Sequence, residues 1–231
     1  MRITAITPIR VGRSELTRRQ ARYDALSPPS VEVELIDLPD HPDVPRSLES
    51  DSDIRASERL VIEEATNLDP SRCDAILPDC VLDPGLDQLE AEASVPTFGI
   101  LKLSAGFLLA AGHKFAAFTR NQAIGDELCG RLARYGYLPQ FDRIAVLDLS
   151  FEDIANDEEW NKALREAGEQ FLGSSTSAVI NGCSAVELRP NSQDAVTIVD
   201  PTKLALLIIG LAADSGLTTQ DVRNYSLGVG G

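Results

Sequence analysis

The stretch Asp74-Ala75-Ile76-Leu77-Pro78-Asp79-Cys80 has a close counterpart in Ser177-Ala178-Val179-Ile180-Asn181-Gly182-Cys183. Each begins with a short apolar run typical of a buried strand, continues with a polar or turn-forming pair, and ends in a cysteine. In open α/β sheets, ligands bind at the carboxyl ends of the strands. We therefore predict that Cys80 and Cys183 face each other across a small-molecule substrate.

The residues that follow each cysteine favour a helix, over 82–86 in the first stretch and over 184–188 in the second. A thiol between a strand end and a helix start lies near backbone amides and the positive end of the helix dipole. Both lower the pKa of a thiol, so we expect the two cysteines to be activated in this way.

Working outward, strand-like apolar segments alternate with segments of helical periodicity. Strands are predicted at 3–6, 31–38, 75–77, 95–99, 114–119, 142–147, 178–180 and 196–199. Helices are predicted at 14–23, 53–67, 86–93, 104–111, 122–135, 157–171 and 201–213. This alternation favours parallel sheets flanked by helices, which is an α/β fold.

The two cysteine stretches occupy equivalent places in the two halves of the chain. Two pseudo-equivalent α/β lobes, each a parallel sheet flanked by helices, explain this better than one long sheet does, and they place the active site in the cleft between the lobes. We predict a first lobe from residues 1–98 and 201–231, which carries Cys80, and a second lobe from residues 99–200, which carries Cys183.

The composition limits the classes of partner. A chain of 231 residues with 43% hydrophobic residues can bury a full core. Its net charge of −15 argues against nucleic acid and anionic membranes, because both need a basic surface. The longest apolar stretch, 204–213, is about half of what a membrane span requires, and residues 1–6 do not resemble a signal peptide. We expect a cytoplasmic protein that acts on a small molecule.

The four cysteines are expected to be reduced, because the chain is long and has no secretion signal. No Cys-x-x-Cys motif occurs, and neither histidine, His41 or His113, stands at ligand spacing from a cysteine, so no metal site is expected. Glycine-rich phosphate loops are also absent, and no cofactor is predicted. Cys73 and Cys129 are interpreted as packing residues.

These features resemble the aspartate/glutamate/hydantoin racemase superfamily, most closely its hydantoin racemase branch. Cys80 followed by Asp83-Pro84-Gly85-Leu86 resembles the first cysteine motif of that branch, and Asn181-Gly182-Cys183-Ser184 resembles the second. Residues 114–119 and Val199-Asp200-Pro201 fit the central strand and the closing strand-to-helix turn of the family. The similarity extends over essentially the whole chain.

The resemblance implies a cofactor-independent racemase or epimerase that inverts a carbon next to a carbonyl. Removing the proton needs a base on one face, and returning it needs an acid on the other, so one cysteine thiolate and one thiol suffice. The resemblance makes Cys80 and Cys183 catalytic and suggests a homo-oligomer. We predict substrate contacts by residues from both lobes, namely Thr7, Pro8, Val81, Thr119 and Ser184.

Three departures from the branch bear on the substrate. Thr7-Pro8-Ile9-Arg10 stands where the branch usually has Asn-Pro-Asn and a hydroxyl residue, and Gly99-Ile100-Leu101-Lys102 replaces Gly-Ile-Gly-Glu. Asp79 replaces a glycine and brings a carboxylate beside Cys80, which raises the pKa of a thiol. We expect a hydantoin-like cyclic amide or amino-acid derivative, or a compound with an anionic group near Lys102.

Two alternatives stay open. The first is a cis–trans isomerase that acts on a small diacid through a cysteine nucleophile. Another branch of the same superfamily is similar to enzymes of this kind. The second is a non-catalytic small-molecule-binding protein on the same scaffold. A covalent adduct on one thiol would identify the isomerase. Ligand stabilisation that survives replacement of both cysteines, without isotope exchange, would identify the binding protein.

Overall fold

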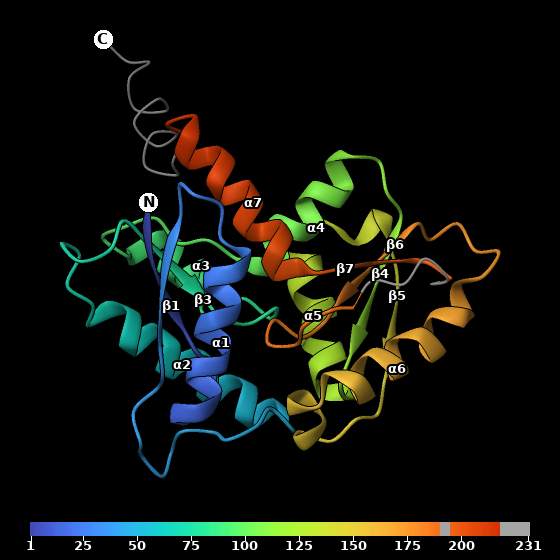
Figure 1. Ribbon diagram of the computed structural model, residues 1–231, viewed down its shortest axis with the longest axis horizontal. Helices are drawn as coiled ribbons and strands as arrows, with labels where there is room; N and C mark the ends of the chain where they lie inside the picture. The colour runs from blue at the N-terminus through green and yellow to red at the C-terminus, as the bar shows by residue number, and fades with distance from the viewer. Residues whose placement is uncertain (190–194, 218–231) are drawn as a thin grey trace.

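The computed structural model describes residues 1–189 and 195–217. It consists of two parallel sheets flanked by helices, one toward each end of the molecule (Figure 1). The predicted α/β fold with two lobes is confirmed.

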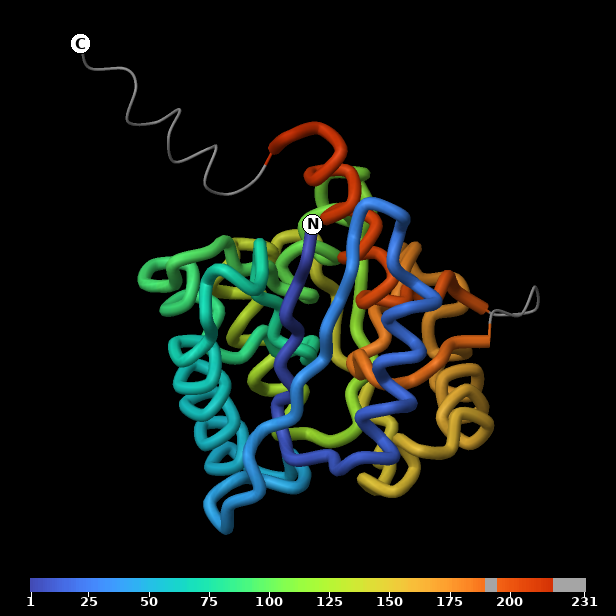
Figure 2. Tube along the Cα trace, turned by 60° about the vertical axis from the view of Figure 1, so that its left-hand side comes forward, coloured from blue at the N-terminus to red at the C-terminus, as the bar shows by residue number. Residues whose placement is uncertain are grey.

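The first sheet has three parallel strands in the order β2-β1-β3. Its lobe contains β1 (Arg2–Ile6), α1 (Arg13–Leu26), β2 (Glu32–Ile36), α2 (Asp51–Thr66), β3 (Ala75–Pro78) and α3 (Leu86–Glu92). On β1, Ile3 and Ala5 pack in the same cluster as Tyr23 of α1, whereas Ile6 packs with Val61 of α2. The two helices therefore cover opposite faces of the sheet, as Figure 2 shows.

The second sheet has four parallel strands in the order β5-β4-β6-β7. The elements of this part of the chain are α4 (Ile100–Ala110), β4 (Phe115–Thr119), α5 (Gln122–Arg134), β5 (Phe141–Val146), α6 (Asp157–Gly168), β6 (Ala178–Asn181), β7 (Thr197–Val199) and α7 (Pro201–Asp214). Phe118 of β4 packs with Trp160 of α6, whereas Phe115 packs with Leu128 of α5. This sheet is also covered on both faces.

The two sheets have the same arrangement around their central strands. β1 lies between β2 and β3, just as β4 lies between β5 and β6. The strand predicted at 95–99 is reduced to a single parallel bridge between Ile76 of β3 and Thr97. This bridge lies beside β3 in the position that β7 takes beside β6 in the second sheet. Pro96 cannot donate a ladder hydrogen bond, which limits this pairing. Cys80 and Cys183 thus follow equivalent strands.

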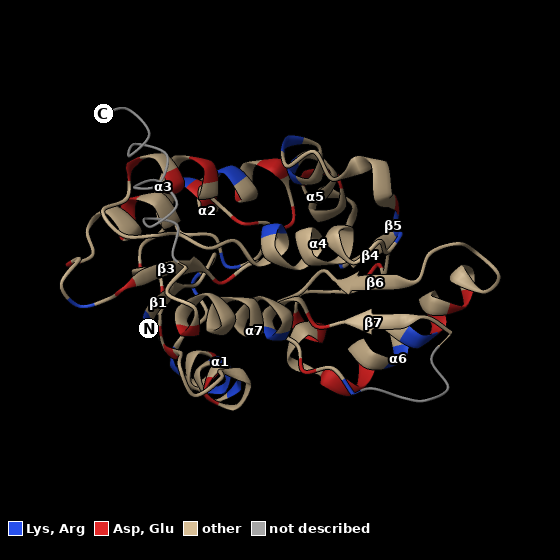
Figure 3. Cartoon of the chain, turned by 90° about the horizontal axis from the view of Figure 1, so that it is seen from above, with Lys and Arg blue, Asp and Glu red and all other residues tan. Residues whose placement is uncertain are grey.

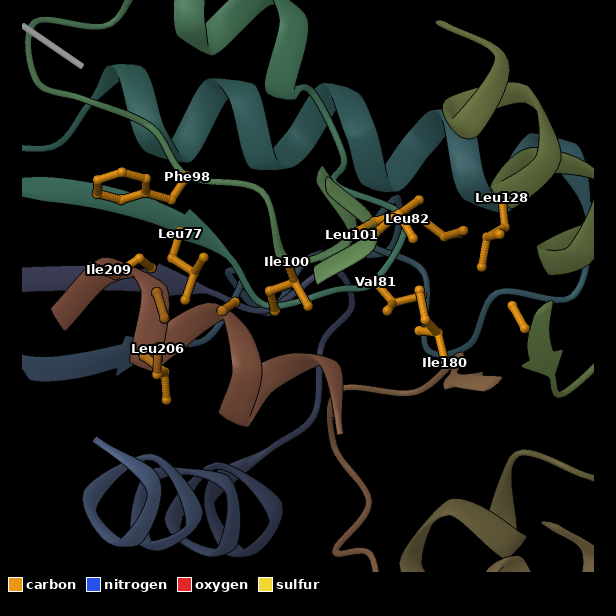
Figure 4. Close-up of a cluster of buried hydrophobic side chains, with 14 of the residues drawn as sticks. Leu77, Val81, Leu82, Phe98, Ile100, Leu101, Leu128, Ile180, Leu206 and Ile209 are labelled. Atoms are coloured by element: carbon orange, nitrogen blue, oxygen red, sulfur yellow. The ribbon is translucent and has the colours of Figure 1, made fainter. Parts of the chain in front are cut away.

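A shared hydrophobic core joins the two lobes (Figure 4). It combines Leu77 of β3 and Ile100 of α4 with Ile180 of β6 and with Leu206 and Ile209 of α7. Helix α7 packs against α4 and α1, and α4 also contacts β6. Burial of each such aliphatic side chain stabilises the fold by about 1.5–3 kcal/mol, so the core holds the two cysteine turns in a fixed relation. The lobe boundaries at 98 and 200 stay a prediction.

In the part of the chain that the structure describes, no helix combines the length and apolar character needed to span a bilayer.

Candidate active site

A cavity of about 60 Å³ lies between the two lobes, at the carboxyl ends of β3 and β6. Both Cys80 and Cys183 line it. Its other polar walls are Arg19, Asp79, Arg120 and Ser184, and its apolar walls include Leu48, Ile124, Phe151 and Ile154. A larger groove of about 730 Å³ runs along α1 and α7, but neither cysteine lines it, so the smaller cavity is the candidate site.

The turn that carries Cys80 is tied to the other lobe through Asp83. Asp83 has a left-handed backbone, with φ of 47°, and its buried carboxylate accepts hydrogen bonds from the amides of Leu101 and Lys102 at 3.0 and 2.9 Å. The hydroxyl of Tyr135 donates to the same carboxylate at 3.0 Å. These bonds cap α4 from a distant loop and fix the position of Cys80 relative to the second lobe.

The turn that carries Cys183 is held by Asn181. The side chain of this buried residue accepts a hydrogen bond from Nε1 of Trp160 at 3.0 Å and donates to the Cys183 carbonyl at 2.8 Å. Gly182 lies so close to β4 that a Cβ atom there would be 2.0 Å from the carbonyl oxygen of Phe118. The prediction of a helix at 184–188 is wrong, because residues 184–186 form a turn and bends instead.

One hydrogen bond joins the two cysteine turns directly. The Ser184 hydroxyl donates to the Asp79 carbonyl at 3.1 Å in a buried position. Because Asp79 precedes Cys80 and Ser184 follows Cys183, this bond fixes the separation of the two backbones that carry the thiols.

The Asp79 carboxylate is buried in a polar cluster. Arg19 donates to it at 3.2 Å and the Tyr23 hydroxyl at 2.8 Å, and all three residues are at most 5% exposed. Arg19 also donates to Glu15 at 2.8 Å. A buried carboxylate with no such partners would lower the stability of the fold by several kcal/mol. The cluster therefore explains how the fold tolerates Asp79 at a position where the hydantoin racemase branch usually has glycine.

Burial raises the pKa of Cys80 to about 12. The amide of Leu82 donates to its sulfur at 3.4 Å and opposes this rise, whereas the carboxylates of Asp79 and Asp83 add to it. Desolvation is the largest of these effects, although the side chain is only partly buried and faces the cavity. The expectation that its surroundings lower the pKa of this thiol is wrong.

Burial and the Asp79 carboxylate also raise the pKa of Cys183, while the guanidinium of Arg19 and the amide of Ala185 oppose this rise. The expectation of a lowered pKa is wrong for this thiol too. The two thiols are therefore not equivalent. The carboxylates of Asp79 and Asp83 disfavour the Cys80 thiolate, whereas at Cys183 the guanidinium of Arg19 acts against the single carboxylate of Asp79, so ionisation is easier at Cys183.

The predicted substrate residues divide into two groups. Pro8, Val81 and Ser184 line the cavity. Thr7 and Thr119 are fully buried outside it, and their hydroxyls donate within the fold, to Asp37 at 3.0 Å and to the Asn121 carbonyl at 3.2 Å. Their role as substrate contacts stays a prediction.

Two arginines at the cavity were missed by the sequence reasoning. Glu15, Arg19 and Tyr23 are spaced by four residues and therefore lie on one face of a helix. This polar face could have indicated that Arg19 takes part in a site. Arg120 had only its place directly after the central strand as a signal. Lys102, in contrast, pairs with Glu90 at 2.6 Å and does not line the cavity.

Residues 1–189 and 195–217 contain no group of three or more His, Cys, Asp or Glu side chains that could hold a metal ion. All four cysteines are unpaired, and Cys73 is buried as predicted, whereas Cys129 is partly exposed on α5.

Comparisons with known proteins identify the family of the chain and solved structures of similar fold. The Asp/Glu/Hydantoin racemase family matches residues 16–208. No curated protein matches the chain significantly. Allantoin racemase from Pseudomonas fluorescens has a TM-score of 0.81 at 19% identity, over 97% of this chain and 96% of its own. Allantoin racemase from Klebsiella pneumoniae has a TM-score of 0.77 at 20% identity, over 95% and 90%.

A more distant likeness is to a double mutant of arylmalonate decarboxylase, with a TM-score of 0.63 at 14% identity over 93% of each chain. At these identities the solved structures show a shared fold, and the family match carries the assignment. The chain belongs to the Asp/Glu/Hydantoin racemase family and is an isomerase of the racemase type.

Proposed function

We propose that this racemase inverts a carbon next to a carbonyl by proton transfer between Cys80 and Cys183. The observation that carries the proposal is that the two thiols come from equivalent strand ends of two lobes and line one cavity. A base and an acid on opposite sides of a planar enolate are what inversion requires, and no cofactor is needed for it.

The two thiols differ in a way that suggests their starting roles. Cys183, beside the guanidinium of Arg19, ionises first and removes the proton from one enantiomer. Cys80, which burial and nearby carboxylates keep protonated, donates a proton to the opposite face of the enolate. The reverse reaction starts with the two protonation states exchanged, so the opposite enantiomer requires Cys80 as the thiolate.

The charges around the cavity favour a neutral substrate. Arg19 is paired with Asp79 and Glu15, and Arg120 with Glu49, so neither guanidinium at the cavity is an uncompensated cation. A carboxylate buried there would lack a counter-ion, which is costly. We therefore propose a hydantoin-like cyclic amide or a neutral amino-acid derivative, in line with the two allantoin racemases of the same fold.

Proton NMR in deuterium oxide tests the proposal. 5-Substituted hydantoins, allantoin, aspartate and glutamate would be incubated with the wild type and with the variants Cys80→Ser and Cys183→Ser. Loss of the α-proton signal and of optical rotation is expected for a cyclic amide, and each substitution should abolish the loss of optical rotation. Cys129→Ser is the matched control, because this thiol lies outside the cavity.

The same experiment addresses the alternatives. Loss of optical rotation that survives either serine variant would refute the two-cysteine mechanism. A covalent adduct of a diacid on one thiol, seen by mass spectrometry, would favour the cis–trans isomerase. Ligand stabilisation without exchange in any protein would favour a binding protein.

We also propose that the protein is a cytoplasmic homo-oligomer whose subunits meet at α4 and α7. These neighbouring helices expose Phe107, Leu207 and Leu211, which are 49%, 50% and 69% exposed. Few positions along the two helices are charged residues (Figure 3). Two copies of a chain with a net charge of −15 repel each other least where carboxylates are absent, and an apolar patch of this kind is typical of an interface.

A further inference from the structure

Arg120, directly after β4, is an unusual residue in the wall of the cavity because it is only 3% exposed. Its two terminal nitrogens are well paired. Nη1 donates to Glu49 at 3.0 Å and to the Leu149 carbonyl at 3.4 Å, and Nη2 donates to the Leu48 carbonyl at 2.9 Å. Nε is also buried, but it has no hydrogen-bond partner among the described residues.

A buried donor of this kind is an exception in native proteins. Most buried polar atoms are paired, and leaving a donor on a charged group unpaired costs stability. The bonds to Leu48 and Glu49 hold the guanidinium in the wall of the cavity, so the unpaired donor stays at this wall. The acceptor that suits it is one that arrives with a ligand in the cavity.

The pairing with Glu49 also defines the chemistry of that acceptor. Glu49 contacts both terminal nitrogens, at 2.8 and 3.0 Å, and neutralises the charge of the guanidinium. A neutralised guanidinium with a single free N–H is matched by a neutral carbonyl oxygen, whereas a carboxylate would need an unpaired cation or two parallel donors.

We propose that Nε–H of Arg120 donates a hydrogen bond to a carbonyl oxygen of the substrate. This inference rests on the proposed racemase function, and it adds a substrate-binding residue to the two thiols. Arg120 comes from the second lobe and is anchored to Leu48, a cavity residue of the first lobe. The contact therefore forms where the two lobes meet over the substrate.

Arg120→Lys tests the proposal, because lysine keeps a cation for Glu49 and removes Nε–H. Two measurements are made: the affinity for 5,5-dimethylhydantoin, a cyclic amide with no α-proton, by calorimetry, and kcat/KM for 5-monosubstituted hydantoins. Loss of one hydrogen bond to a charged donor should lower both by about 10- to 100-fold. Arg131→Lys is the matched control. Arg131 is 2% exposed and paired with Glu58 and Glu127, but it does not line the cavity.

A third variant, Glu49→Gln, separates donation to the substrate from a structural role in joining the lobes. It weakens the ion pair and keeps Nε–H, so its effect on affinity should be clearly smaller than that of Arg120→Lys. The proposal is overturned if Arg120→Lys binds like the wild type, if the effects of Arg120→Lys and Glu49→Gln are equal, or if the wild type binds no dimethylhydantoin. Binding that depends on Arg120 without α-proton exchange would instead overturn the racemase function alone.

Discussion

Replacement of Gly182 by alanine tests how the fold positions the second thiol. The new Cβ would lie 2.0 Å from the Phe118 carbonyl oxygen and 3.2 Å from the Cγ2 atom of Thr119. The first contact is more than 1 Å shorter than a normal van der Waals separation of carbon and oxygen, roughly 3.2 Å or more. The closest partner is a backbone atom of β4, so the clash cannot be relieved by moving a flexible side chain.

The expected loss of stability follows from this geometry. The strand end must move by about 1 Å, which is severe overpacking and costs 1–3 kcal/mol by itself, roughly. The bond from Asn181 to the Cys183 carbonyl, 2.8 Å long, would also be strained, and one such bond contributes about 1 kcal/mol. We expect Gly182→Ala to lower the free energy of unfolding by about 3 kcal/mol. A 1 Å displacement of Cys183 should also lower kcat about 100-fold.

Urea unfolding of both proteins, analysed by linear extrapolation, measures the change. Gly130→Ala is the control, because an added Cβ there meets nothing within 4 Å and the residue is exposed inside α5. Alanine in a helix interior should stabilise by about 0.5–1 kcal/mol. A Gly182→Ala protein within 0.5 kcal/mol of the wild type, on the order of the measurement error, would refute the reasoning.

Three further predictions concern the polar groups around the site. Tyr23→Phe removes a 2.8 Å bond to the buried Asp79 carboxylate and should cost about 1.5–3 kcal/mol in thermal or urea unfolding; a change below 0.5 kcal/mol, roughly, would contradict this. Alkylation followed by peptide mass spectrometry should give Cys183 a lower apparent pKa than Cys80, and the reverse order would exclude Cys183 as the first base. Burial raises the pKa of Asp83 to about 6, above its value in the unfolded chain. Protonation of Asp83 therefore stabilises the folded protein. This stabilisation is fully present below about pH 4 and is lost as the pH rises through 6. The difference in unfolding free energy between wild type and Asp83→Asn should therefore fall by about 2–3 kcal/mol over that range, and a flat difference would contradict it.

The sequence was sufficient for the features that depend on local patterns. Apolar runs and helical periodicity located almost every strand and helix, because each of these elements buries a regular face. The start of α4 could not be read in this way. It begins at Ile100, four residues before the predicted start, because the carboxylate of Asp83, distant in the sequence, accepts hydrogen bonds from its first amides.

In the candidate site, too, the residues set by local sequence patterns were predicted and those set by distant contacts were not. Cys80 and Cys183 were found because their position after a strand is a local pattern that occurs twice. Arg120 was not found, because its place in the cavity wall depends on contacts with Leu48 and Glu49, more than 70 residues away in the sequence. The helix predicted after Cys183 was wrong for a related reason, since Ser184 bonds to Asp79 across the lobes instead of starting a helix.

The pseudo-symmetric fold carries an asymmetric set of charges, and this has a consequence for the chemistry. Equivalent strands place the thiols on two sides of one cavity, yet Asp79 lies beside Cys80 and directs Arg19 toward the neighbourhood of Cys183. A glycine at position 79 would leave Arg19 without this buried partner and would remove a carboxylate from the surroundings of Cys80. In the proposed mechanism this departure makes the two directions of the reaction unequal, because Asp79 raises the pKa of Cys80, the proposed acid for one enantiomer, and holds the guanidinium that opposes the pKa rise of Cys183, the proposed base.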